Sequence, residues 1–78
     1  MDLERWEENG TVADFGVGDD WATLYTIESH NPGHGYAKAL LKQAKAHYEG
    51  MGKKFGGSVS LNSKMSAIYE ELGIHEYK

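Results

Sequence analysis

The run His30-Asn31-Pro32-Gly33-His34-Gly35 divides the chain into two parts with different apolar periodicity. Proline and two glycines favour a loop over a helix or a strand. Before this run the apolar residues recur at every second position, and directly after it they recur with helical spacing. The sequence therefore predicts a strand that enters a loop near residue 29 and a helix that begins near residue 36.

Two segments before the loop have the periodicity of strands. Thr11 to Val17 alternates apolar with polar or small residues, and Trp21 to Ser29 is rich in aromatic and β-branched residues. In the second segment we expect one face to carry Trp21, Thr23, Tyr25 and Ile27 and the other to carry Leu24. Gly18-Asp19-Asp20 suits a turn, so the two segments predict an antiparallel hairpin. The opening segment, Asp2 to Asn9, fits either a helical turn or an edge strand.

After the loop the sequence predicts a helix, a strand and a second helix. Tyr36 to Glu49 has apolar residues at helical spacing, and Gly50 and Gly52 follow it. Phe55 to Leu61 alternates again, and we expect it to lie parallel to the strand before the helix in a right-handed βαβ unit.

Asn62 or Ser63 can cap the second helix, and Gly73 can end it. Its apolar stripe is Met65, Ile68, Tyr69 and Leu72. Ile74 to Tyr77 suits a short final strand. These elements predict one α+β domain over residues 1–78, with a mixed β-sheet that begins with an antiparallel hairpin and continues as β-α-β-α-(β).

Composition narrows the class of function. Twelve acidic and eight basic residues give a net charge of −4, which disfavours nucleic acid and suits a cationic partner. Without cysteine, the chain has no disulfides and no thiolate nucleophile. No apolar run approaches the roughly 20 residues of a membrane span, and the acidic start lacks the features of a secretion signal. We expect a soluble, cytoplasmic protein with no membrane partner.

The loop before the first helix has the features of an anion site. The first amides of a helix have no acceptor within the helix, and the helix dipole is positive there. Gly33 and Gly35 allow backbone amides to approach a phosphate, and the small Ala37 leaves room over the first turn. The loop lacks the Gly-Lys-Ser/Thr ending of a P-loop and the third glycine of the dinucleotide fingerprint. A plain strand-to-helix turn is the alternative interpretation.

Two motifs resemble those of the GNAT superfamily of N-acetyltransferases. The run from Pro32 to Leu41 is similar to motif A, Gln/Arg-x-x-Gly-x-Gly/Ala followed by an apolar helix. The run from Asn62 to Ile74 resembles motif B, in which an asparagine begins a helix that ends in Tyr-Glu-x-Leu-Gly. The resemblance extends from about Trp21 to the C-terminus. Pro32 departs from the pattern, because the family usually has arginine or glutamine there.

The resemblance implies an enzyme that moves acetyl from acetyl-CoA to an amine acceptor, either a small molecule or a protein lysine or N-terminus. It makes Tyr69 the acid that protonates the departing thiolate, and Glu28 or His30 the base that deprotonates the amine. It assigns cofactor binding to Ile27, Ser29, Gly33, His34, Gly35, Tyr36, Ala37 and Asn62. The alternative interpretations make Tyr69 a core residue, Glu28 and His30 solvated residues, and Asn62 a helix cap.

Family members carry further N-terminal elements that wall the acceptor site, and no match to them is present here. We therefore expect self-association, as in a homodimer, through the sheet edge or a bare sheet face. The alternative function is an inactive module that binds acetyl-CoA or a protein. His30 and His34 are four residues apart, but no third ligand is evident and we expect no metal site.

Overall fold

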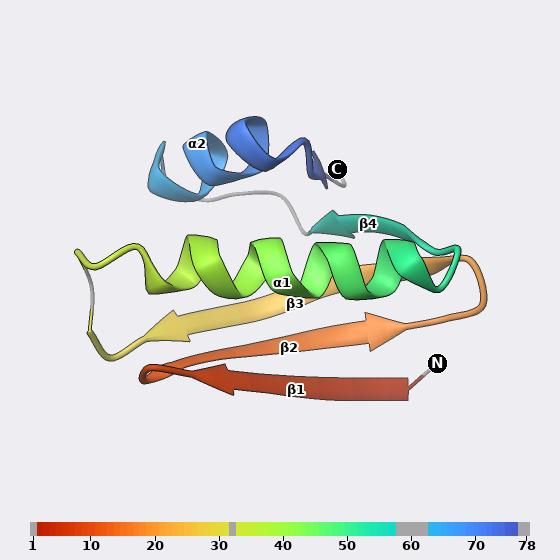
Figure 1. Ribbon diagram of the computed structural model, residues 1–78, viewed down its shortest axis with the longest axis horizontal. Helices are drawn as coiled ribbons and strands as arrows, with labels where there is room; N and C mark the ends of the chain where they lie inside the picture. Colours follow the sequence, from red (N-terminus) through yellow and green to blue (C-terminus); the bar gives the residue numbers. More distant parts are fainter. Residues whose placement is uncertain (1, 32, 58–62, 77–78) are drawn as a thin grey trace.

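The computed structural model describes residues 2–31, 33–57 and 63–76. It shows a small α+β fold, in which two helices accompany one mixed sheet (Figure 1). Within the described residues the strands lie across the sheet in chain order, from β1 at one edge to β5 at the other. The strands are β1 (Asp2–Glu8), β2 (Thr11–Val17), β3 (Trp21–Ser29), β4 (Lys54–Gly57) and β5 (His75–Glu76), and the helices are α1 (Tyr36–Gly50) and α2 (Ser63–Leu72).

The first three strands form an antiparallel meander. The predicted hairpin of β2 and β3 is confirmed, and β1 pairs antiparallel with β2 along its whole length. Asn9 and Gly10 join β1 to β2, with φ angles of 51° and 76°. Positive φ at both central residues is the requirement of the type I′ turn, which asparagine followed by glycine satisfies. The opening segment is therefore an edge strand and not a helical turn.

A parallel pair follows the meander, as the sequence predicts. β3 pairs with β4 from Trp21 opposite Lys54 to Leu24 opposite Gly57, with α1 between the two strands in the chain. The short β5 then pairs parallel with β4. Residues 58–61, which the sequence assigns to the same strand as β4, lie outside the described residues.

A β-bulge changes the faces of β3. The register of β2 with β3 shifts between Asp14 and Phe15, where β3 contributes one more residue than β2. The extra residue is Tyr25. Because an extra residue reverses the alternation of side chains beyond it, Ile27 packs against the core on the same side as Leu24. The prediction that Tyr25 and Ile27 share a face is wrong for this reason.

The core lies between the sheet and α1. Phe15 and Phe55 from the sheet contact Tyr48 of α1, with ring centroids 5.6 and 6.2 Å from that of Tyr48. Rings at these separations add favourable edge and stacking contacts to the area that they bury. The helix also buries Leu40, Leu41 and Ala44, as its apolar spacing predicts.

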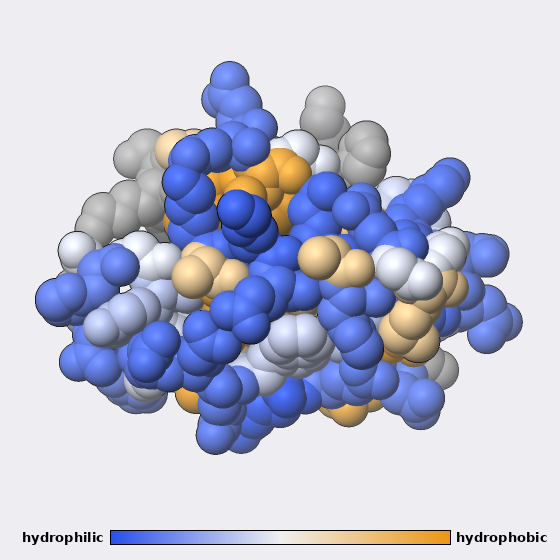
Figure 2. All heavy atoms as spheres, in the orientation of Figure 1, coloured by the Kyte–Doolittle hydropathy of each residue, from blue (hydrophilic) through white to orange (hydrophobic). Residues whose placement is uncertain are grey.

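Helix α2 extends the core on the same side of the sheet as α1. Tyr69 is buried, and the partly buried residues that complete its predicted stripe are Met65, Ile68 and Leu72. Lys38 of α1 forms an ion pair with Glu71 of α2, so the two helices lie side by side. Figure 2 shows this side of the molecule, which is mostly hydrophilic with an apolar area over α2. Neither described helix is long and apolar enough to cross a bilayer.

The other face of the sheet carries no described helix. Arg5 pairs with Asp14 there at 2.9 Å, and Thr26 donates a hydrogen bond to the same carboxylate. Leu3 and Tyr25 expose 72% and 41% of their surfaces. This face is therefore a mixture of ion pairs and single apolar side chains.

Candidate functional site

The loop between β3 and α1 turns on two glycines with left-handed backbone. Gly33 and Gly35 have φ angles of 89° and 73°, which L side chains rarely adopt. A Cβ added at either position would meet no atom within 4 Å. Backbone conformation and not packing therefore requires glycine here, and the space beside both residues is open.

The N-terminus of α1 presents free amides at this loop. The helix begins at Tyr36, no side chain caps it, and its first turn holds no acidic residue. The amide of Ala39 donates to the carbonyl of Gly35, so the amides of residues 36–38 precede the first helical hydrogen bond. With the positive end of the helix dipole added, this end of α1 suits an anion.

The loop is anchored to the turn between β1 and β2. The amide of His30 donates to the carbonyl of Gly10 at 2.9 Å, and the side chain of Asn31 donates to the carbonyl of Asn9 at 3.2 Å. The rings of His34 and Tyr36 are stacked, with centroids 5.3 Å apart. Pro32 lies outside the described residues.

The end of β3 places its candidate residues on two faces. Ile27 and Ser29 are half-buried on the side of α1, and the Ser29 hydroxyl accepts a hydrogen bond from Thr11 at 3.2 Å. Glu28 is exposed on the opposite face because side chains alternate along a strand. His30 is exposed just beyond the strand. The structure therefore does not bring Glu28 together with Ile27 and Ser29.

Tyr69 lies in the core, with 5% of its surface exposed. Its hydroxyl lies against Gly57, where an added Cβ would clash with the hydroxyl and come within 2.7 Å of the ring carbon Cζ. Gly57 is opposite Leu24, at the end of the described pairing of β3 with β4. The hydroxyl therefore lies over β4, which at Gly57 pairs with β3 on one side and with β5 on the other. Asn62, the other candidate from motif B, lies outside the described residues.

The hydroxyl of Tyr48 lies in a hydrogen-bond network that helical spacing, which predicts only a buried ring, does not reveal. Its hydroxyl donates to Glu4 at 2.6 Å and accepts from the indole N–H of Trp6 at 3.0 Å. Burial, and then the hydrogen bond to Glu4, raise the pKa of Tyr48 to about 12. This network joins α1 to β1, so it belongs to the fold and not to the loop site.

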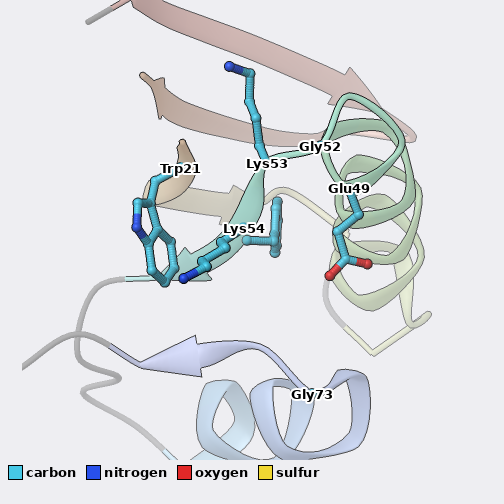
Figure 3. A pocket seen from close by; sticks show the side chains of 7 residues that line it. Trp21, Glu49, Gly52, Lys53, Lys54 and Gly73 are labelled. Carbon is cyan, nitrogen blue, oxygen red and sulfur yellow. The ribbon is translucent and has the colours of Figure 1, made fainter. Parts of the chain in front are cut away.

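A cavity of about 600 Å³ lies at the other end of β3 (Figure 3). Its walls include Trp21 and Lys54 from the sheet and Glu49 from the last turn of α1. Glu49 and Lys54 are close in the sequence, but Trp21 is distant from both and is brought to them by its pairing with Lys54. Sequence reasoning missed this cavity for that reason.

Metal-ligating side chains do not cluster in the described part of the chain. No group of three or more histidine, aspartate or glutamate side chains there has the geometry to hold a metal ion. His30 and His34 are exposed residues between β3 and α1.

No protein-family model matches this chain, and no match is found among curated proteins or among solved structures.

Proposed function

We propose that this chain belongs to the GNAT superfamily, as its motifs suggest, and that it transfers acetyl from acetyl-CoA to an amine. The observation that carries the proposal is the loop before α1. Two left-handed glycines, open space beside them and an uncapped helix N-terminus without acidic residues meet directly after a strand. This arrangement supports binding of the CoA pyrophosphate.

The pyrophosphate would be held by main chain. The amides of residues 33–37 provide the donors; residues 33–35 are exposed and residues 36 and 37 are half-buried. Lys38 is already paired with Glu71, so the described loop supplies few side-chain cations. The main chain of β3 around Ile27 and Ser29 would bind the pantetheine arm, as the resemblance implies.

The proposed reaction is a direct attack of the amine nitrogen on the thioester carbon. Glu28 or His30 takes a proton from the amine, the carbon–sulfur bond breaks, and Tyr69 gives a proton to the departing thiolate. Glu28 and Tyr69 lie on opposite sides of the sheet.

The burial of Tyr69 favours a second function, a module that binds CoA without transferring acetyl. Tyr69 is buried, and its hydroxyl lies against Gly57. A residue whose only role is packing has this environment, and a chain that binds CoA without an accessible acid would be a binding module. Measuring binding and turnover separately distinguishes the two functions.

Titration of CoA into ¹⁵N-labelled protein tests the binding step. The largest amide shifts should fall on residues 33–38. Gly35→Ala should weaken binding by about tenfold, equivalent to 1.4 kcal/mol, because it adds a methyl group beside the phosphate. Gly52→Ala is the matched control, since Gly52 also has positive φ and open space but lies beyond the other end of α1. Equal CoA affinity of the two variants would refute the site.

Acetyl transfer at saturating acetyl-CoA, measured across several amines, tests the chemistry. Tyr69→Phe keeps the ring in the core and removes the hydroxyl. Loss of a general acid should slow transfer by about a hundredfold to ten-thousandfold while CoA affinity is retained. An unchanged rate in the folded variant would leave Tyr69 with a packing role. CoA binding with no transfer by the wild type would establish the binding module.

A further inference from the structure

The turn between β1 and β2 carries a reactive dipeptide, Asn9 followed by Gly10. In an asparagine–glycine pair the glycine nitrogen can attack the side-chain carbon Cγ of the asparagine, because glycine has no Cβ that shields this approach. Both residues are exposed, and within the described part of the chain the Gly10 amide donates no hydrogen bond. The attacking nitrogen is therefore neither covered nor held.

Main-chain atoms of this turn hold the loop that leads to α1. The carbonyl of Gly10 accepts a hydrogen bond from the amide of His30 at 2.9 Å. The carbonyl of Asn9 accepts one from the side chain of Asn31 at 3.2 Å, and a Cβ added to Gly10 would come within 2.6 Å of the same Asn31 nitrogen. Figure 1 shows the turn and the start of the loop at the same end of the sheet. A change in the main chain of the turn therefore changes the anchor of the loop.

We propose that Asn9 is a deamidation site and that its modification releases the loop before α1. The Gly10 nitrogen forms a bond to Cγ of Asn9, the bond from Cγ to the carboxamide nitrogen breaks, and the amide proton of Gly10 leaves with that nitrogen as ammonia. Water then opens the five-membered imide at one of its two carbonyl carbons and gives aspartate or isoaspartate. Water is the only co-reactant, and the reaction is independent of acetyl transfer.

The two products differ in their effect on the anchor. Aspartate leaves the main chain as it was and only adds a negative charge. Isoaspartate carries the main chain through Cγ, which lengthens the turn by one methylene group and converts the former main-chain carbonyl of residue 9 into a free carboxylate. A type I′ turn requires two central residues of ordinary length, so the carbonyls of the lengthened turn no longer meet both His30 and Asn31.

The anchor in turn slows the reaction. In a type I′ turn the nitrogen of the second central residue points away from the side chain of the first, so ring closure requires rotation about the Cα–C bond of Asn9. The carbonyl oxygen of Asn9 belongs to the same planar peptide unit as the Gly10 nitrogen and rotates with it. The hydrogen bond from Asn31 to this oxygen must therefore break first. Since such coupling is reciprocal, loss of the loop contact should speed deamidation, and the isoaspartate product should weaken the contact.

Peptide mapping of protein kept in mildly alkaline buffer tests the reaction. Digestion after glutamate releases peptide 9–28, in which Asn9 is the single asparagine. This peptide should gain the mass of an amide-to-acid exchange and elute with synthetic standards that contain aspartate and isoaspartate. Asn31 should stay intact, because the nitrogen of Pro32 has no proton to lose.

Two variants test the coupling. Asn31→Ala should deamidate about fivefold faster than the wild type when folded, the change that one hydrogen bond typically makes to an opening equilibrium. In urea, where the anchor is absent, the two proteins should react at equal rates. Thr26→Val removes one side-chain hydrogen bond, to Asp14 on the other face of the sheet, and is the matched control that should keep the wild-type rate.

The spectrum of the modified protein tests the release of the loop. The added carboxylate separates this form by anion exchange, and its isoaspartate component should show shifted amides at residues 30, 31 and 33–37 in ¹⁵N-labelled protein. Asn9→Asp should leave these amides close to their wild-type positions. The proposal is overturned if peptide 9–28 of the folded protein keeps its carboxamide over weeks, if Asn31→Ala reacts no faster than Thr26→Val, or if the isoaspartate component keeps the wild-type loop spectrum.

Discussion

Tyr48→Phe isolates the network that fastens the edge strand to the helix. The ring of Tyr48 is fully buried, and phenylalanine preserves its contacts with Phe15 and Phe55. Only the hydroxyl is lost, with its hydrogen bonds to Glu4 and Trp6. The variant therefore measures how much these two bonds contribute to the free energy of unfolding.

The two bonds set the expected magnitude. A hydrogen bond to a charged group contributes about 1.5–3 kcal/mol and one between neutral groups about 0.5–1.5 kcal/mol. Glu4 is exposed and Trp6 half-buried, so water replaces part of what the variant loses. We expect a loss near 2 kcal/mol in urea unfolding at pH 8, which for a domain of this size lowers Tm by about 10 °C.

Alkaline pH gives the same network a second readout. The pKa of Tyr48 is raised from the ordinary 10.0 to about 12 in the folded protein. The protonated Tyr48 hydroxyl therefore contributes its full stabilisation below pH 10. The contribution is lost as the pH rises to 12, because the tyrosine ionises more readily in the unfolded chain. The loss amounts to about 2.7 kcal/mol at most. The Tyr48→Phe variant does not undergo this loss, because phenylalanine has no hydroxyl to ionise. The stability difference between wild type and variant should therefore shrink toward zero between pH 10 and 12.

Tyr25→Phe is the control, because it removes one hydroxyl from a tyrosine on the other face of the sheet. At pH 8 this control should lose less stability than Tyr48→Phe, because Tyr25 is 41% exposed and Tyr48 is fully buried. The reasoning fails if Tyr48→Phe is as stable as the wild type at pH 8. It also fails if its difference from the wild type does not change between pH 10 and 12.

Three further outcomes follow from the structure. Gly57→Ala should lower stability by about 1–3 kcal/mol in urea unfolding, because its Cβ would meet the hydroxyl of Tyr69, whereas Gly50→Ala has open space and should cost far less. The Arg5 guanidinium lowers the pKa of Asp14, so Asp14→Asn should lose less stability than the wild type as the pH falls below 4 in acid unfolding. Sedimentation at high micromolar concentration should show self-association, and a monomer there would leave the bare face of the sheet without a partner copy.

The order and type of the elements could be predicted because each segment has its own periodicity. Alternation predicted β2, β3 and the start of β4, and helical spacing predicted the stripe of α1 that ends at Tyr48. The identity of β1 was left open, although Asn9-Gly10 is the strongest short hairpin signal in the chain. Its alternation is obscured by acidic residues, which an exposed edge strand tolerates on both faces.

The faces of β3 could not be predicted beyond its bulge. A bulge depends on how two strands pair, and the residues around Tyr25 carry no local signal for it. The ring of Tyr25 lies over Gly16 of the neighbouring strand, a contact that strict alternation does not specify. The consequence reaches the candidate site, because the bulge determines that Ile27 faces the core and Glu28 faces the opposite side.

The role of Tyr69 shows where a motif and a packed structure give different information. The motif B resemblance makes its hydroxyl a proton donor, and helical spacing makes its ring a core residue. The structure confirms the packing, because the ring is buried and the hydroxyl lies against Gly57. That same contact places the hydroxyl over β4 at Gly57, the residue that pairs with Leu24 of β3 on one side and with β5 on the other. Burial of the ring does not decide the role of the hydroxyl, and the proposed acid catalysis is tested by the rate of Tyr69→Phe.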